Sequence, residues 1–298
     1  MKRIVDVSGY GCKLKLDCGR LMLEGKDGSQ TTLSVADIAV VVLSDSAVSV
    51  SGAVLAELAS VGVTVVVSDR AHTPIGLFQP IAANSRQTAI LLGQIRAKEQ
   101  VKARLWRRIV EEKIRSQVEV LKENGKEWKD IVSIKVVRGD ALNAEGTAAR
   151  HYWRRLGLFP VRDRSAQDAN CILNYGYAIL YATAARALCA SGLNTSLGLK
   201  HCGPTNAHCL ASDIMEPFRA VIDRCVINWV KAFPNVNEVS RECKRSILGA
   251  IMASRWTTAI GNVCLFDALT RMSVSLRESL INNCVDLEIP EYAGRMVA

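Results

Sequence analysis

The residues with the clearest chemical potential are two carboxylates and two histidines gathered in one stretch of the chain. The run GLKHCGPTNAHCLASDIMEPFRAVID carries His201, His208, Asp213 and Glu216. Asp213 and Glu216 are three residues apart, so a helix through this stretch places them on one face. Their neighbours are apolar, and burying carboxylates is costly unless a cation compensates the charge. The sequence leaves two explanations open, an ion pair with Arg219 or a metal site.

A third carboxylate, Glu145, lies in the segment DALNAEGTAARHYWRRL, whose alanines form a small-residue face if the segment is helical. An acid on such a face either completes a polar network or binds a ligand. A Glu, a His and a further carboxylate make an oxygen-rich site that suits Mg²⁺ or Mn²⁺, and the imidazole favours Mn²⁺. Such a site activates a hydroxyl nucleophile and neutralises charge at phosphorus. The residues alone therefore favour a metal-dependent nuclease or strand transferase.

The candidate ligands belong to a part of the chain with helical periodicity. From about residue 88, apolar residues recur with the spacing of one helix face, as at Leu105, Ile109 and Val110. The residues between them are often basic. They would suit a nucleic-acid partner, but an ordinary solvated helix face has the same pattern. Further helices are expected near residues 140–156, 168–191, 207–231, 237–252 and 256–284. The sequence thus predicts a larger, all-α catalytic and DNA-binding domain over residues 91–298.

Residues 1–78 have a different pattern, in which short β-branched segments are separated by Gly, Asp and Ser. One helical segment, SGAVLAELASVG, interrupts them, with Ser51 placed to cap it and Gly62 placed to end it. The following stretch, TPIGLFQPIAANSRQTAI, has two prolines and small polar residues, and we place a linker at residues 79–90. The predicted fold class is α+β, with a small N-terminal β domain that carries one helix.

The basic charge of the chain lies in its second part. The 298 residues carry a formal net charge of +9. Residues 1–78 hold seven Lys or Arg against eight Asp or Glu, so the remainder has a balance of +10. Such an excess favours a polyanionic partner, because neutralising phosphates releases condensed counterions. A basic surface without a nucleic-acid partner is the alternative that charge alone leaves open.

Several classes of protein fit the sequence poorly. The apolar core of a secretory signal does not follow the first three residues, and no uncharged apolar stretch of roughly 18 residues indicates a membrane span. The ten cysteines include no C-x-x-C pair, so neither a disulfide framework nor a zinc knuckle is expected. The chain is therefore expected to be cytoplasmic, with no membrane partner.

Five segments follow one another in a recognisable order. SDRAHTPIG reads D-x-x-H-x-P-x-G, and LWRRIVEEKIRSQ reads L-W-x-x-I-V-x-x-K-I-x-x-Q. They are followed by LNAEGTAARHYW, then NCILNYGYAIL, then CLASDIMEPFRAVID. These segments resemble the motifs of the CRISPR-associated protein-one family, the integrase of spacer acquisition. The resemblance covers nearly the whole chain and looks closest to members from type II systems.

The resemblance implies particular site residues. Glu145, His201 and Glu216 fall on the family's catalytic ligands for one divalent ion, Mg²⁺ or Mn²⁺. Asp213 falls on a nearby acid, to which we assign a supporting role. The candidates for contacts with DNA phosphates are Arg104, Arg107, Arg108, Arg162 and Arg219.

The sequence departs from the family's pattern in three places. Lys200 precedes His201 where type II members usually carry another histidine or an aromatic residue. His208 stands where an aromatic residue is common, which makes it either a rival metal ligand or a packing residue. LFPVRDRSAQDAN deviates around the family's F-x-x-R segment, although Phe159 and Arg162 are kept. Whether His208 or Asp213 also ligates the metal is left open.

The family's activity implies an assembly and a reaction. A homodimer pairs its β domains, and two such dimers flank a dimer of CRISPR-associated protein two. A duplex prespacer lies across the assembly, held through its phosphates. Each prespacer 3′-OH then attacks a phosphodiester at an edge of the CRISPR repeat, which is a transesterification. Further type II adaptation proteins are also expected as partners.

Two other functions compete with this one. A general metal-dependent nuclease would use water as the nucleophile in place of the 3′-OH. A non-catalytic DNA-binding scaffold would use the acids only to pair with Arg219 and its neighbours.

Overall fold

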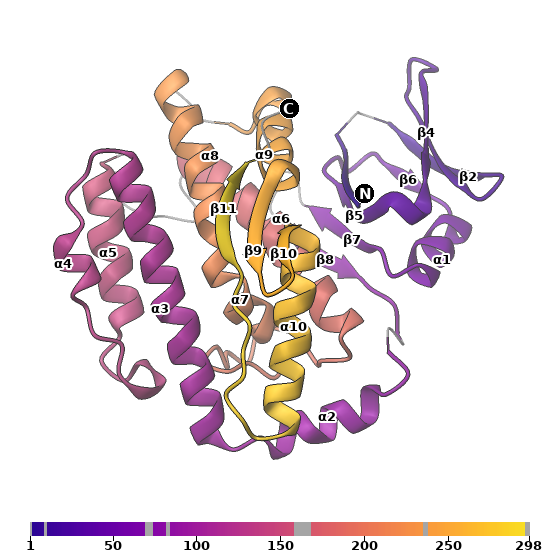
Figure 1. The fold of residues 1–298 in the computed structure, drawn as a ribbon. Coiled ribbons are helices and arrows are strands. Elements are labelled where there is room, and N and C mark those ends of the chain that lie inside the picture. Colours follow the sequence, from indigo (N-terminus) through magenta and orange to yellow (C-terminus); the bar gives the residue numbers. More distant parts are fainter. Residues whose placement is uncertain are drawn as a thin grey trace. The chain divides into compact units, whose positions relative to one another are not determined.

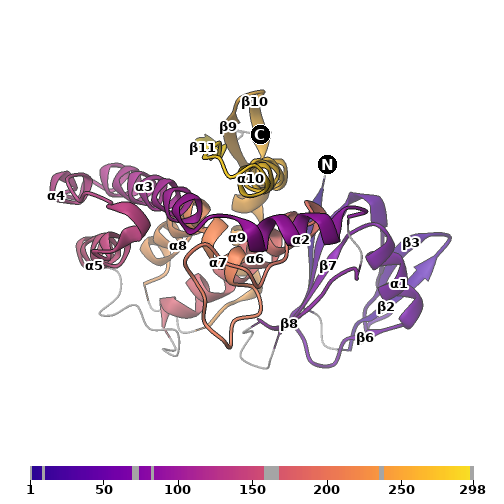
Figure 2. The same ribbon diagram turned by 90° about the horizontal axis from the view of Figure 1, so that it is seen from below.

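The structure, a computed structural model, describes residues 2–8, 11–68, 74–81, 84–157, 168–234 and 238–295. The chain divides into two compact units, Met1–Ser85 and Arg86–Ala298. The first is built on β-sheets and the second is mainly helical, which confirms the predicted α+β class (Figure 1; Figure 2). Among the described residues, no helix has the length and apolar character needed to cross a membrane.

The N-terminal unit contains two four-stranded sheets. The first has the order β1-β5-β7-β8, in which the first three strands are parallel and the last is antiparallel. Its strands are β1 (Arg3–Val7), β5 (Ile38–Leu43), β7 (Thr64–Ser68) and β8 (Pro74–Phe78). The second sheet has the order β4-β3-β2-β6, with β4 (Gln30–Ser34), β3 (Arg20–Glu24), β2 (Lys13–Asp17) and β6 (Ser49–Val50).

The sequence pattern explains most of this unit. The run IAVVVL forms β5, a central strand that is almost wholly buried, and such a continuous apolar run is typical of a parallel sheet covered on both faces. Helix α1 (Gly52–Ser60) begins as predicted, since the Ser51 side chain accepts a hydrogen bond from the Val54 N–H at 3.3 Å. The edge strand β8 was not predicted, because Pro74 indicated an irregular segment, but an edge tolerates proline. Residues 69–73 of the first motif lie outside the described residues.

Helix α6 (Ala169–Ala190) forms the core of the second unit. It is buried along most of its length and packs against α7 (Cys209–Ile214), α8 (Arg219–Ala232), α9 (Arg241–Ala253) and α10 (Leu265–Ile281). Gly176 lets α6 and α8 approach closely, because a Cβ there would lie 2.4 Å from Ile222 Cγ2. This close approach gives a structural reason for the glycine in the segment NCILNYGYAIL.

The remaining α-helices of this unit precede α6 in the chain. They are α2 (Gln87–Arg96), α3 (Glu99–Glu123), α4 (Lys129–Val132) and α5 (Ala144–Leu156). The long amphipathic helix α3 packs against α5 and α8, and Figure 1 and Figure 2 both show α3 beside α5. Two short 3-10 turns, η2 (Arg138–Asp140) and η3 (Glu216–Phe218), also pack against α3.

The second unit is mainly helical, as predicted, but it is not all-α. It contains a small antiparallel sheet with the order β10-β9-β11, formed by β9 (Ser254–Thr258), β10 (Gly261–Cys264) and β11 (Glu291–Arg295). The helix expected from residue 256 starts only at Leu265. The physical reason is a hairpin, which the β-branched pair Thr257 and Thr258 favours and Gly261, at a φ of 106°, makes possible.

Candidate active site

Glu145 lies in the first turn of α5, where its direction is fixed by capping groups. The carboxylate of Asp140 accepts hydrogen bonds from the N–H groups of Ala144 at 2.7 Å and of Glu145 at 3.2 Å. Asn143 takes a left-handed conformation, with a φ of 52°, and its side chain accepts a hydrogen bond from the Gly146 N–H. These contacts satisfy free N–H groups of the first turn and fix the backbone from which the Glu145 side chain extends.

Glu216 lies at a break between two helices. The single helix expected over residues 207–231 is interrupted after α7, and Glu216 begins the turn η3 that leads into α8. Pro217 accounts for the break, because it has no N–H for the helical hydrogen-bond ladder. The Glu216 side chain is 2% exposed. A carboxylate so deeply buried requires cationic partners.

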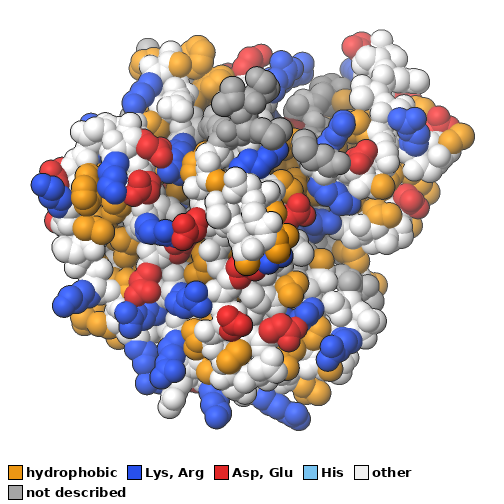
Figure 3. All heavy atoms as spheres, viewed as in Figure 1, with side chains coloured by type: hydrophobic (Ala, Val, Ile, Leu, Met, Phe, Trp, Pro, Cys, Tyr) orange, Lys and Arg blue, Asp and Glu red, His pale blue; other side chains and the backbone are white. Residues whose placement is uncertain are grey.

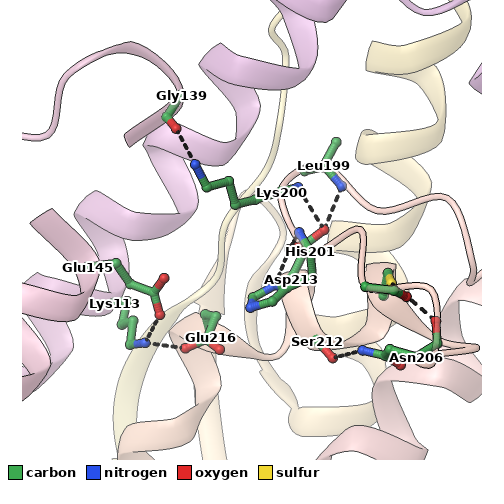
Figure 4. Close-up of polar contacts among 12 residues, drawn as sticks. Lys113, Gly139, Glu145, Leu199, Lys200, His201, Asn206, Ser212, Asp213 and Glu216 are labelled. Atoms are coloured by element: carbon green, nitrogen blue, oxygen red, sulfur yellow. Dashed lines mark hydrogen bonds and ion pairs between the residues drawn. The ribbon is translucent and has the colours of Figure 1, made fainter. Parts of the chain in front are cut away.

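Lys113, from the middle of α3, joins these two carboxylates. Its Nζ lies 2.5 Å from Oε1 of Glu145 and 2.6 Å from Oε2 of Glu216. Figure 4 shows the amine between the two acids, which come from separate segments of the chain. The Lys113 side chain is itself buried. The structure therefore brings two of the three predicted ligands to one cation position.

Lys113 was not among the predicted site residues, although the sequence carries a signal for it. Lys113 follows Ile109 by four residues and Val110 by three, so it lies on the apolar face of the helix. Lysine is almost never fully buried unless it is paired. A lysine at a core position of an amphipathic helix therefore predicts a buried acidic partner.

Arg219 supplies a second positive charge to Glu216. One guanidinium nitrogen lies 2.9 Å from Oε1 of Glu216. Burial by itself raises the pKa of Glu216, but Arg219 and Lys113 outweigh it and hold that pKa below its ordinary value. The ion pair that the sequence allowed with Arg219 is thus present, and it involves Glu216. Glu216 remains ionised in the folded protein.

A buried network holds Arg219 in place. Its guanidinium carbon lies 4.8 Å from the ring centre of Tyr177, a cation–π contact. The hydroxyl of Tyr177 donates a hydrogen bond to Asp223, which also accepts one from Tyr152 at 2.8 Å. Burial raises the pKa of Asp223. Tyr177 of α6 and Tyr152 of α5 therefore belong to the network that holds Arg219, and Arg219 in turn pairs with Glu216.

His201 is oriented by Asp213, which is fully buried. Nδ1 of His201 lies 2.6 Å from Oδ1 of Asp213. The Asp213 carboxylate also accepts hydrogen bonds from the backbone N–H groups of Leu199, at 2.6 Å, and Lys200 (Figure 4). Because Asp213 can only accept, Nδ1 carries the proton, and Nε2 of the neutral ring is the nitrogen left to bind a ligand. The ring of Trp106 packs edge-on against the imidazole, with 5.7 Å between the two ring centres.

The environment of His201 favours its protonated form. The hydrogen bond to Asp213 raises the pKa of His201 above its ordinary value, and this effect outweighs the opposing effect of burial. The negative charges of Glu216 and Glu145 raise the pKa further. The imidazole therefore lies in the field of both candidate carboxylate ligands.

Lys200 and Gly198 help to fix the position of the loop that carries His201. The Nζ of Lys200 donates a hydrogen bond to the Gly139 carbonyl at 3.1 Å, in the turn before α5 (Figure 4). A Cβ at Gly198 would lie 2.1 Å from the His201 carbonyl oxygen and 3.0 Å from Oδ2 of Asp213. Lys200, a departure from the family's pattern, thus joins the segments that carry two of the candidate ligands. Gly198 leaves the space that the loop needs.

The other candidates lie in different environments. His208 contacts Thr195 Oγ1 through Nδ1 at 2.7 Å and packs edge-on against Tyr181, and burial lowers its pKa. Arg104, Arg107 and Arg108 are exposed on α3, and Arg107 forms an ion pair with Glu111 at 2.7 Å. Figure 3 shows Lys and Arg side chains over this face of the helical unit, mixed with acidic ones. Phe159 and Arg162 lie outside the described residues.

The donor set can be compared with the needs of a divalent ion. Within the described parts of the chain, no three His, Cys, Asp or Glu side chains converge closely enough to enclose a metal as they stand. The Lys113 ammonium lies between the two glutamates. Oε2 of Glu216 is buried and lies 2.6 Å from the Lys113 ammonium. Two carboxylates and an imidazole suit Mg²⁺ or Mn²⁺ in kind.

Comparison with known proteins gives consistent relatives. The family described as CRISPR associated protein Cas1 matches residues 5–233. The CRISPR-associated endonuclease Cas1 of Neisseria meningitidis serogroup C is 35% identical over 225 residues, which cover 73% of each chain.

Two solved structures show the same fold. A casposase bound to an integration product superposes with a TM-score of 0.79 at 18% identity, covering 96% of this chain and 92% of the other. A chain of a complex described as Cas6-RT-Cas1–Cas2 superposes with a TM-score of 0.78 at 17% identity, covering 100% of this chain and 36% of the other.

Proposed function

The chain belongs to the CRISPR-associated Cas1 family, and we propose that it is a metal-dependent DNA integrase that joins prespacer 3′-OH ends to a CRISPR repeat. Membership of a family whose curated relatives are named endonucleases supports a role in CRISPR adaptation with chemistry at phosphodiesters. The observation that carries the proposal is the meeting of Glu145 and Glu216 at one buried cation position. His201, oriented by Asp213, completes the set of donors.

Each residue of the site has a part in the proposed reaction. Glu145, Glu216 and His201 would hold one Mg²⁺ or Mn²⁺. When bound, the ion supplies Lewis-acid chemistry, lowering the pKa of the attacking hydroxyl and neutralising charge that develops at phosphorus. Asp213 holds the imidazole in the tautomer that leaves Nε2 free. Arg219 keeps Glu216 ionised and correctly directed.

DNA would be bound mainly outside the site. Exposed basic residues of α3, among them Arg104, Arg107 and Arg108, are proposed to contact the phosphates of the prespacer and the repeat. Arg162 is kept in this set as a proposal from the sequence. The main role that we propose for Arg219 is to position Glu216, because the two residues form an ion pair. The resulting reaction is a transesterification, in which the O–P bond formed by the 3′-OH replaces the one broken in the repeat.

The proposed assembly follows the family. We propose a homodimer joined through the N-terminal units of its two copies, two such dimers on a dimer of CRISPR-associated protein two, and further type II adaptation proteins as partners. Two structural neighbours, a chain of a Cas6-RT-Cas1–Cas2 complex and a casposase bound to an integration product, are compatible with DNA and protein two as partners.

The proposal predicts separate losses of chemistry and binding. Replacing one ligand, in Glu145→Gln or His201→Ala, is expected to lower strand transfer by more than about a hundredfold, because a ligand of the metal is removed. Duplex binding is expected to stay near the wild-type level, since it depends on dispersed basic residues. Glu119→Gln, which changes an exposed acid paired with Lys122 on α3, is the matched control.

The assay uses a labelled duplex with free 3′-OH ends, a supercoiled plasmid that carries the repeat, and Mn²⁺. Joined products that disappear in both ligand variants support the integrase. Nicked plasmid without joined label identifies a nuclease that uses water. Metal-indifferent binding without any covalent product identifies a scaffold, and wild-type rates in both variants contradict the assigned ligands.

A further inference from the structure

The contacts of Lys113 raise a question that the proposed reaction does not answer. Its ammonium is buried and touches both carboxylates that are proposed to bind the metal. Figure 4 shows it in contact with both Glu145 and Glu216. The cation position of the site is therefore taken by a side chain of the protein itself.

An ammonium at this place contributes to the stability of the site. Two carboxylates that approach one point repel each other, and burial strengthens that repulsion. Arg219 pairs directly with Oε1 of Glu216, and it acts on Glu145 only at longer range. Lys113 is the cation that contacts both, so it holds the two acids at the separation seen here.

The same ammonium opposes a divalent ion. Two cations within contact of one carboxylate pair repel strongly in a buried site. The contacts that a divalent ion would have to replace are two ion pairs, at 2.5 Å with Oε1 of Glu145 and at 2.6 Å with Oε2 of Glu216. Lysine also has a flexible stem, so its ammonium can leave while α3 stays in place.

We propose that Lys113 is the resident cation of the metal-free site, a positioning residue that prearranges Glu145 and Glu216 and that a divalent ion must displace. This inference rests on the proposed function, because it takes those two acids as metal ligands. Two consequences follow. Lys113 weakens metal binding by competition, and without metal it stabilises the fold around the site.

The test measures Mn²⁺ affinity of the full chain by titration calorimetry and by electron paramagnetic resonance. Lys113→Met keeps the length of the side chain and removes its charge, and it is expected to bind Mn²⁺ at least about tenfold more tightly than wild type. Lys113→Arg keeps a cation and is expected to bind no more tightly than wild type. Lys122→Met, on the exposed face of the same helix, is the matched control and is expected to leave the affinity unchanged.

The outcomes separate this inference from the proposed function. If wild-type Mn²⁺ binding is lost in Glu145→Gln while Lys113→Met binds equally or more weakly than wild type, the metal site stands and the inference is wrong. If neither wild type nor Lys113→Met binds Mn²⁺, the proposed metal site is wrong and the inference falls with it.

Thermal unfolding covers the case in which the neutral variant is unstable. Without metal, Lys113→Met is expected to unfold at a lower temperature than wild type, and saturating Mn²⁺ is expected to remove most of that difference. If the variant folds only in Mn²⁺, the inference is supported. If it fails to fold even in saturating Mn²⁺, Lys113 has a structural role that a metal cannot replace, and the inference is overturned.

Discussion

His201 and Asp213 form the part of the site whose protonation can be followed directly. The Nδ1–H donates to a fully buried carboxylate that is also fixed by backbone N–H groups. Asp213 therefore cannot turn away from the ring without losing those bonds. The pair fixes both the orientation and the tautomer of the imidazole, which is the usual role of a carboxylate behind a ligand histidine.

The first prediction concerns the pKa of His201 in the metal-free protein. It is expected to lie above 6.5, because the hydrogen bond to Asp213 stabilises the imidazolium more than burial destabilises it. Asp213→Asn is expected to lower this pKa. NMR titration of the imidazole, assigned by comparison with His201→Ala, measures both values. A pKa at or below 6.5 in the unchanged protein would contradict the assigned hydrogen bond.

The raised pKa of His201 fixes the direction of two pH effects. The His201–Asp213 ion pair stabilises the fold fully below about pH 6.5, and its contribution is lost as the pH rises through the higher folded-state pKa. Binding of Mn²⁺ requires the neutral imidazole, so the Mn²⁺ affinity is expected to increase as the pH rises through the same value.

The sequence grouped the right acids but assigned their partners incompletely. A spacing of three residues put Asp213 and Glu216 on one face with Arg219 as a common partner. In the structure Asp213 bonds to the histidine loop, and Glu216 bonds to Arg219 and Lys113. The difference arises because the helix ends between the two acids. Which tertiary partner a buried acid finds cannot be deduced from spacing within one segment.

At the scale of elements, the site depends on three short segments held around α3. The first turn of α5, the turn η3 and the loop before α7 each present one candidate ligand. Helix α3 packs against α5, η2 and η3. The long helix thus acts as the common support on which the ligand segments are placed.

Gly198→Ala tests the loop that carries His201. The added Cβ would collide with the His201 carbonyl, a backbone atom, so the loop has to shift. We expect weaker Mn²⁺ binding, slower strand transfer and a lower melting temperature. Gly249→Ala in α9 is the control, because nothing lies within 4 Å of its Cβ, and a helical Gly-to-Ala change stabilises by up to about 1 kcal/mol. Equal Mn²⁺ affinity and equal strand transfer in both variants would show that the loop position is unimportant.

Helices and most strands were predictable at this scale, and their interruptions were not. Apolar periodicity predicted α3, α5, α6 and α8 because their buried faces are long. The break at Lys98 between α2 and α3, and the hairpin at residues 254–264, span too few residues to leave a periodic signal. Pro217 was visible in the sequence, but its effect depends on the tertiary position of the turn.

At the scale of the whole molecule, the charge is divided between the two units. The excess of basic residues lies outside residues 1–78. On α3 the exposed arginines share the surface with acids, and Arg107 is already paired with Glu111. Net charge therefore predicts the kind of partner but not the phosphate contacts. Residues 158–167, which include the candidate Arg162, lie outside the described part of the chain.

Arg104 and Arg108 test the DNA surface. The double variant Arg104→Ala/Arg108→Ala is expected to weaken duplex binding and to reduce the slope of log affinity against log salt by about 1 to 2, since each phosphate contact contributes about 0.9. Its Mn²⁺ affinity is expected to remain unchanged. Arg20→Ala, an exposed change in the N-terminal unit, is the control. A salt slope equal to that of wild type would place the DNA elsewhere.

A crystal soaked in Mn²⁺ shows whether Glu145, Glu216 and His201 bind one divalent ion. We expect one anomalous peak between the two carboxylates and Nε2 of His201, with the Lys113 ammonium moved away from both acids. A crystal with saturating Mn²⁺, in which the peak lies elsewhere and Lys113 still bridges the glutamates, would contradict it.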